Sequence, residues 1–459
     1  MSHNVAVDRQ VSPGPFYEQL IDRHHLCRGQ VVIVVIILMA MMVDGIGIHL
    51  LSDVAPIVIA EWRLTTSQFG PAMAGSLIGM IFGTVAGGWL GDRFGPRRIL
   101  ISATVLFGLS TIAASFSAVL QSLILMRMIS GLGFGAAAPN AIALAVDWIP
   151  GRSRTKVLAL LSVSAPLGGA LGAGMAAMVI PAFGWRGCFV ASGIIAILAA
   201  VLVTVRLPEA LSYLRRSGAE DKILRLLKKN TGIEVFDRPP LTTQTFRIAP
   251  KLKRPIISTL YWRVALGTSL SNFLLHVASL GIVAWATVYL TAHDFTIRQA
   301  LQTVMLCNLC AAAGALCSAY LIEIFGTKRL LVFSLTVATA CIILVAIALG
   351  DRSDDFPSKI VVQIALALAM FLIGMCMTAQ WAIMAHGYAP EFRGTGLGIG
   401  LTLGRLGILT ILLSGGSLIA LDPNLSYFFT AIIVALIGAV LSTFITDRHV
   451  RSKNHLPES

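Results

Sequence analysis

The chain has 459 residues, of which 56% are hydrophobic and only 12% are charged, and its mean hydropathy is +0.82. This composition leaves too few polar side chains to cover a soluble globule of that size, so it excludes a water-soluble protein. A formal net charge of +13 would suit nucleic-acid binding. The basic residues, however, lie between long apolar segments, which is the pattern of a membrane protein. We expect the chain to lie in a lipid bilayer and to bind no nucleic acid.

The first 29 residues are polar and lack the short apolar core and small-residue cleavage site of a signal peptide. We expect this tail, residues 1–29, to stay in the cytoplasm. The seven cysteines are scattered, nearly all in apolar segments, and Cys307 and Cys310 have no further ligand residues beside them. We therefore expect the cysteines to be packing residues, and we expect no metal and no cofactor.

Twelve apolar segments are each long enough for a membrane-spanning helix, which takes about 20 residues. The predicted spans are residues 30–52, 70–90, 98–117, 121–146, 156–180, 186–206, 260–290, 299–323, 329–350, 358–386, 393–419 and 426–446. They form an N-terminal half (30–206) and a C-terminal half (260–446), separated by a basic linker (207–259) and followed by a tail (447–459). The sequence predicts an all-α membrane protein with twelve transmembrane helices in two pseudo-symmetric six-helix halves.

The positions of the basic residues predict the orientation. With both termini in the cytoplasm, 28 of the 35 lysines and arginines fall in the tails and cytoplasmic loops, which satisfies the positive-inside rule. Within the linker, Lys222, Arg225 and Lys228 flank Ile223 and Leu227 at helical spacing. We expect this segment to form a basic amphipathic helix on the inner membrane surface.

One loop pattern occurs in both halves. After the second span, Asp92 is followed by a Phe-Gly pair and by basic residues, and after the eighth span Glu323 is followed by the same pattern. Such repeats are typical of transporters whose halves rock about a central site. We expect the loop acids to pair with basic groups or helix N-termini in one access state only. The predicted conformational latch consists of Asp92, Arg93, Arg97, Arg98 and Glu323.

The segment from Gly87 to Arg98 resembles the loop signature of the major facilitator superfamily, and the resemblance in architecture covers nearly the whole chain. Other motifs resemble the aromatic acid:proton symporters within that superfamily. They are Asp44-Gly45 in the first span, Arg127 with Gly131, Gly133, Gly135 and Pro139 in the fourth, and Glu391 to Gly396 with Gly404-Arg405 in the eleventh. The resemblance implies import of benzoate-like carboxylates with protons. The chain departs from that family at Gly47, where a second aspartate usually stands.

Asp44 is the first candidate for proton coupling. An ionised carboxylate at the middle of a membrane helix costs about 3 kcal/mol on insertion scales, so such residues mark function by default. The alternative is a packing role, with Asp44 tied to a neighbouring backbone group or cation. His49 is the second candidate because imidazole takes up and releases protons near neutral pH. On a regular helix, His49 and Asp53 share one face and are turned away from Asp44.

Arg127 and Arg405 are arginines inside predicted spans. A guanidinium stays charged, and its planar fork matches a carboxylate, so each arginine needs an anionic partner or a watery cavity. An anionic substrate is one such partner, and an internal acid such as Asp44 or Asp147 is the alternative. For Arg405, which lies deeper in its span, we expect a role in substrate binding.

The remaining substrate-binding candidates lie in the seventh and tenth spans. Asn272 and His276 are one turn apart, and Trp381 and His386 share a face of their helix. An indole can cover an aromatic ring or anchor a helix at the bilayer interface. Each histidine can equally be a packing residue.

Gly75, Gly79, Gly83 and Gly87 recur at every fourth residue of the second span. Without side chains on that face, a neighbouring backbone can approach closely. The pattern predicts a packing seam.

Together these patterns predict a secondary active transporter in the inner membrane, and not an enzyme. It would import a small organic anion, most simply an aromatic carboxylate, by proton symport with alternating access, and it would act as a monomer. No ATP-binding loop of the Gly-x4-Gly-Lys-Ser/Thr kind is present, so an ion gradient is the expected energy source. Two alternatives stay open: an efflux antiporter, suggested by the Pro166 to Gly169 segment, and a non-transporting membrane sensor.

Overall fold

The computed structural model describes residues 21, 26–231, 262–350, 356–387, 393–422, 425–447 and 449. Across these residues the chain forms helices and no strands. The N-terminal half contains α2 (Arg28–Glu61), α3 (Thr66–Phe94), α4 (Pro96–Ser115), α5 (Leu120–Trp148), α6 (Gly151–Ser162) and α7 (Ser164–Arg206). The linker contributes α8 (Leu211–Arg216) and α9 (Glu220–Thr231). The C-terminal half contains α10 (Trp262–Ala284), α11 (Ala286–Thr291), α12 (Ile297–Phe325), α13 (Thr327–Gly350), α14 (Phe356–Gly387), α15 (Arg393–Leu421) and α16 (Ser426–Ile445).

Eleven helical segments within the described chain are long and apolar enough to span a membrane. One of them, Gly151–Arg206, has 56 residues, or about 84 Å of helix at 1.5 Å per residue, against a hydrocarbon core of about 30 Å. It breaks at Gly184, whose φ of 62° and ψ of −170° are not helical. The predicted spans 156–180 and 186–206 lie on either side of this break. We count it as two crossings, which restores the predicted total of twelve.

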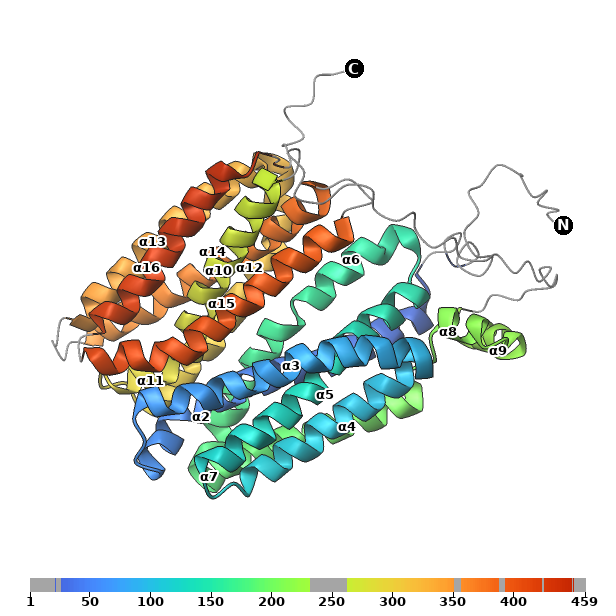
Figure 1. Ribbon diagram of the computed structural model, residues 1–459, viewed down its shortest axis with the longest axis horizontal. Helices are drawn as coiled ribbons and strands as arrows, with labels where there is room; N and C mark the ends of the chain where they lie inside the picture. Colours follow the sequence, from blue (N-terminus) through green and yellow to red (C-terminus); the bar gives the residue numbers. More distant parts are fainter. Residues whose placement is uncertain are drawn as a thin grey trace, which may run out of the picture.

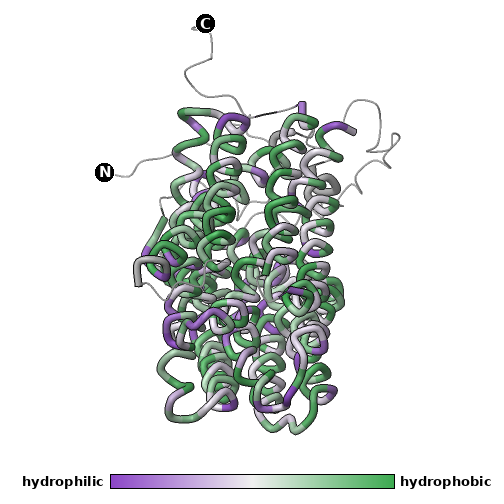
Figure 2. The backbone as a smooth tube through the Cα atoms, turned by 90° about the vertical axis from the view of Figure 1, so that its left-hand side faces the viewer, coloured by the Kyte–Doolittle hydropathy of each residue, from purple (hydrophilic) through white to green (hydrophobic). Residues whose placement is uncertain are grey.

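The two halves form two bundles that lie side by side (Figure 1). Apolar residues run along most of the length of the helices (Figure 2). The bundles meet near the turn between α2 and α3, residues 62–65, which we call the α2–α3 end. There the Thr66 hydroxyl donates a hydrogen bond of 2.8 Å to the carbonyl oxygen of Gly416 on α15. Deeper in, the Thr287 hydroxyl of α11 donates to the carbonyl oxygen of Ser52 on α2. Among the described residues, both of these hydrogen bonds between the halves run from a hydroxyl group to a backbone carbonyl.

The linker helix predicted from its basic and apolar spacing is present as α9. Its lysines and Arg225 are exposed, whereas Ile223 and Leu227 are fully buried in a core that includes Ile33 of α2. The carbonyl of Asn230 lies so close to Gly29 that a side chain at Gly29 would overlap it. The apolar face expected against the membrane surface is therefore covered by protein, because the ends of the N-terminal helices offer an apolar surface to it.

The glycine stripe of α3 packs against α5, as the four-residue spacing predicts. A Cβ atom added to Gly79 would overlap the carbonyl oxygen of Met128, and one added to Gly83 would overlap that of Leu132. By contrast, nothing lies within 4 Å of a Cβ added to Gly88 on the same helix. The two backbones are in direct contact along this seam, so a methyl group cannot be accommodated there without moving a helix.

This contrast yields a test of the seam. Gly79→Ala should lower the unfolding free energy by about 1–3 kcal/mol, the usual range for overpacking, because the added methyl group pushes α3 and α5 apart. Gly88→Ala adds the same methyl group to open space and serves as the control. Thermal unfolding of the two purified variants in one detergent makes the comparison. Equal midpoints would contradict the proposed seam.

Candidate functional site

Asp44 lies at the midpoint of the 34-residue helix α2 and is only 6% exposed. The next residue, Gly45, lies against the backbone of Ala165 and Gly168 on α7, so α2 and α7 are packed tightly here. Among the described residues no arginine, lysine or histidine forms an ion pair with Asp44. A buried carboxyl group without a cation favours its protonated form. This is the environment that a reversible proton-binding residue requires.

Arg127 is buried on α5 with 2% exposure and is held by two other helices. Its guanidinium donates hydrogen bonds of 3.0 Å to the carbonyl oxygen of Gly47 on α2 and of 2.9 Å to the Ser76 hydroxyl on α3. Asp147, one of the two internal acids considered as partners, accepts instead from the backbone and hydroxyl of Ser212. Arg127 therefore ties α5 to α2 and α3 through neutral groups. The role of Ser76 had no signal in the sequence, since an isolated hydroxyl group within an apolar helix commonly bonds only to its own backbone.

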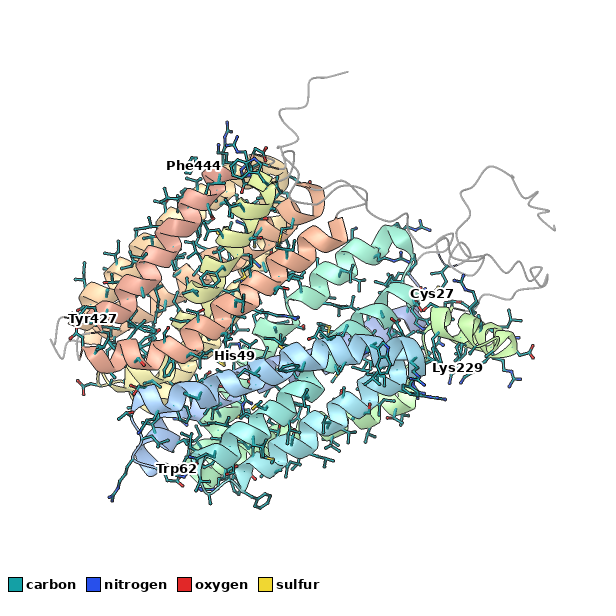
Figure 3. All side chains as sticks on the ribbon, viewed as in Figure 1. Cys27, His49, Trp62, Lys229, Tyr427 and Phe444 are labelled. Atoms are coloured by element: carbon teal, nitrogen blue, oxygen red, sulfur yellow. The ribbon has the colours of Figure 1, made fainter. Side chains whose placement is uncertain are left out.

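His49 lies where the two halves meet (Figure 3). A Cβ atom added to Gly169 of α7 would lie 2.6 Å from Cδ2 of His49 and 2.9 Å from the side-chain oxygen of Asn308 on α12. The imidazole and this amide from the other half therefore converge on one glycine. Asp53 follows His49 by one turn and is completely buried. The geometry separates His49 and Asp53 from Arg127, whose contacts are to Gly47 and Ser76.

In the C-terminal half, Asn272 and His276 of α10 pack against α15. The Asn272 side-chain nitrogen donates 2.6 Å to the carbonyl oxygen of Gly400, and Nδ1 of His276 lies 2.8 Å from the carbonyl oxygen of Asn272. Both side chains occupy the space left by Gly404, where an added Cβ would lie 2.6 Å from the amide nitrogen and 2.9 Å from the imidazole. Arg405 is the next residue and interacts electrostatically with His276. The structure thus brings three of the predicted substrate-binding residues together.

Arg405 differs from Arg127 in what its guanidinium contacts. It lies near the middle of α15 and is half-buried, and within the part of the chain that the structure describes it forms no hydrogen bond or ion pair. Nearby, the side-chain oxygen atoms of Asn272 and Gln380 are buried and also lack partners among the described groups. Among the described groups, the site therefore combines the guanidinium of Arg405, which has no partner, with two side-chain oxygen atoms that accept no hydrogen bond.

Gln380 of α14 borders this cluster, and Trp381 is the next residue along that helix. The Gln380 side-chain nitrogen donates to the hydroxyl of Ser271, the residue before Asn272. Trp381 is 45% exposed, so its ring is available to a ligand or to lipid. The side chain of His386 lies outside the described residues, and its expected role stays a prediction.

Four of the five predicted latch residues lie at the junction of α3 and α4, and Glu323 lies on α12. The Arg93 guanidinium lies 5.7 Å from the ring centre of Trp89 and 5.4 Å from that of Phe94. The Arg97 guanidinium donates to the carbonyl oxygen of Thr204 on α7. Asp92 and Arg98 are exposed at this junction, and Glu323 is exposed at the corresponding end of α12. The role of these residues as a conformational latch stays a prediction.

Glu209 is a functional candidate that the sequence did not reveal. It is 6% exposed, and its carboxylate accepts hydrogen bonds from the backbone nitrogens of Arg97 at 2.9 Å and Ala210 at 3.1 Å. Helix α4 begins at Pro96, so the carboxylate lies at its N-terminus, where the helix dipole stabilises negative charge. Glu209 therefore ties the latch loop to the start of the linker. Only the fold brings these residues, more than 100 positions apart, into contact.

Comparisons with known proteins agree with this architecture. The sequence model described as Major Facilitator Superfamily matches residues 33–412. The chain is 27% identical to the gallate transporter of Pseudomonas putida, over 94% of each chain. It is also 27% identical to the 4-hydroxybenzoate transporter PcaK of Pseudomonas aeruginosa, over 88% of this chain and 89% of that one. The inward-open xylose transporter XylE of E. coli superposes with a TM-score of 0.73 at 18% identity, covering 92% of this chain and 98% of XylE.

The cap at Glu209 can be tested by comparing two substitutions. Glu209→Ala removes both the charge and the acceptor, and it should destabilise the protein by about 1–2 kcal/mol because α4 loses its N-terminal partner. Glu209→Gln keeps an acceptor oxygen and should lose less. The readout is the thermal unfolding midpoint of the purified variants. A midpoint for Glu209→Ala equal to that of the wild type would rule out the cap.

Proposed function

We propose, from the premise that this chain belongs to the Major Facilitator Superfamily, that it imports an aromatic carboxylate together with protons. It is a multi-pass membrane protein with a small-molecule substrate, a transporter and not an enzyme. Two similar proteins carry gallate and 4-hydroxybenzoate according to their names. Both are aromatic carboxylates, which supports this substrate class for the chain.

The observation that carries the proposal is the unpaired fork of Arg405. A guanidinium within a membrane span is expensive unless an anion or water accompanies it. The described residues around Arg405 provide His276 and amide groups but no acid in contact with it. A carboxylate substrate would supply the missing charge and two parallel hydrogen bonds. Arg127, by contrast, already has partners within its own half.

The groups around Arg405 also suit an aromatic ring bearing polar substituents. The unpartnered oxygen of Asn272 can accept a hydrogen bond from a ring hydroxyl group. Trp381, on the helix that also carries Gln380, offers an exposed indole face for stacking. We propose Asn272, His276, Trp381 and His386 as the residues that position the ring while Arg405 binds the carboxylate.

Proton coupling is assigned to Asp44, with His49 as its partner in the cycle. When Asp44 is protonated, the N-terminal half carries less unpaired charge through the membrane, so the loaded carrier can change its access state more readily. The positive-inside pattern supports an orientation with both termini in the cytoplasm and the α2–α3 end on the outside. The proposed location is the bacterial inner membrane, and the proposed functional unit is the monomer.

Uptake experiments test the function directly. Cells that express the protein should accumulate radiolabelled benzoate or 4-hydroxybenzoate, and a protonophore should abolish the accumulation because the gradient drives it. Cells with an empty vector provide the control. Faster loss of preloaded label from expressing cells would instead identify an efflux antiporter.

A binding experiment tests Arg405. Purified wild-type protein should bind benzoate-like acids more tightly than their uncharged amides, and Arg405→Gln should weaken acid binding by about 10- to 100-fold, as expected for charged hydrogen bonds. Arg405→Lys should also weaken it, because the ammonium group lacks the planar fork. Arg298→Gln, at an exposed position at the start of α12, is the matched control. If Arg405→Gln still discriminates acid from amide as wild type does, the carboxylate binds elsewhere.

A further inference from the structure

Asp53 is a buried acid that the proposed mechanism does not yet use. Its side chain is completely inaccessible, and neither carboxyl oxygen has a hydrogen-bond partner among the described residues. One helical turn earlier, Nδ1 of His49 is also buried without a partner in the described structure. Most buried polar groups are hydrogen-bonded, so two adjacent exceptions on one helix face require an explanation.

The surroundings of Asp53 offer no compensating charge. On α7, a Cβ atom added to Gly172 would lie 3.6 Å from the carboxyl group, and the Cys188 thiol is within electrostatic range. His49 is the titratable neighbour on α2 itself. No lysine or arginine among the described residues forms an ion pair with Asp53. A carboxylate anion would therefore be unpaired in this place, whereas a neutral carboxylic acid fits it.

Asp53 also lies beside the contact between the two halves. The carbonyl oxygen of Ser52, its neighbour in sequence, accepts the hydrogen bond from Thr287 of α11. His49 meets Asn308 of α12 across Gly169. When the halves separate at this end, as alternating access requires, these contacts break and water can reach the same face of α2. Hydration would then let Asp53 take up a proton from outside water.

A side chain at position 47 would meet neighbours on α4 and α5. A Cβ atom added to Gly47 would lie 2.5 Å from the Phe107 ring, and the Gly47 carbonyl is the acceptor for Arg127. Asp44 is one buried acid of α2. Asp53 is the only other acid of α2 that is buried.

We propose that Asp53 is a second proton-binding residue of the transport cycle, which takes up a proton from outside water when the halves are open at the α2–α3 end and stays protonated while they close there. The carboxylate gains one proton and becomes a neutral carboxylic acid before closure. His49, one turn further from that end, is the group through which the proton then leaves toward the cytoplasm, which returns Asp53 to the carboxylate. This proposal rests on the proton coupling proposed above.

The first test uses Asp53→Asn, which keeps the shape and removes the titration. In proteoliposomes, gradient-driven accumulation of labelled benzoate should fall about tenfold or more, a typical coupling effect, while exchange of labelled for unlabelled benzoate at equal pH continues. Asp294→Asn, an exposed acid next to α12, is the matched control. Normal accumulation by a folded Asp53→Asn protein would overturn the proposal. A wild type that neither accumulates nor exchanges benzoate would refute the proposed function instead.

The second test needs no substrate. Infrared difference spectra of the purified protein over a pH titration should show a carbonyl band of a protonated carboxylic acid that Asp53→Asn lacks and Asp44→Asn retains. Loss of this band in Asp53→Asn supports the proton site even if benzoate is the wrong substrate. Identical spectra for wild type and Asp53→Asn would show that Asp53 does not titrate, and would overturn the proposal.

Discussion

The buried guanidinium of Arg127 is the interaction on which the N-terminal half depends. It joins three helices, α5, α2 and α3, through the Gly47 carbonyl and the Ser76 hydroxyl. These bonds are possible because glycines let the backbones approach: a Cβ atom at Gly75 would lie 3.5 Å from Cβ of Arg127. The charge is solvated by protein dipoles in place of water, which makes a membrane-embedded arginine tolerable. The glycine seam of α3 and the polar contacts of Arg127 therefore both hold α3 against α5.

In the proposed mechanism the two intramembrane arginines have different roles. Arg127 has neutral partners from its own half, which suits a residue that keeps helices in position through a conformational cycle. Arg405 has a free fork beside Asn272 and His276, which suits a residue that binds an anion and then releases it. If Arg405 had an internal acid as a permanent partner, a substrate carboxylate would have to compete with it. In this proposal the arginine of the N-terminal half has a structural role, and the arginine of the C-terminal half binds the substrate.

The contact between the halves suits repeated opening and closing. It includes hydrogen bonds to backbone carbonyl groups, from Thr66 to Gly416 and from Thr287 to Ser52, and close packing of small residues. Such contacts can break and re-form without stranding a charge, because they join neutral hydroxyl and carbonyl groups. The acids of α2 lie next to this contact or one to two turns from it, so protonation and separation of the halves can influence each other.

The membrane class, the two six-helix halves and the glycine seam could all be predicted from the sequence. Each follows from a local quantity: the apolar length that crosses a bilayer, a repeated loop pattern, or a four-residue spacing on one helix. The sequence also identified Asp44, Arg127 and Arg405, because a charged residue within an apolar segment is visible without a structure. It could not decide the partners of those residues. Ser76 and Gly47 at Arg127, Glu209 at α4, and the lack of any partner at Asp53 depend on which distant helices pack together. Hydrogen bonding and desolvation are set by neighbours in space, so only the tertiary structure distinguished a tied arginine from a free one and a solvated acid from a buried one.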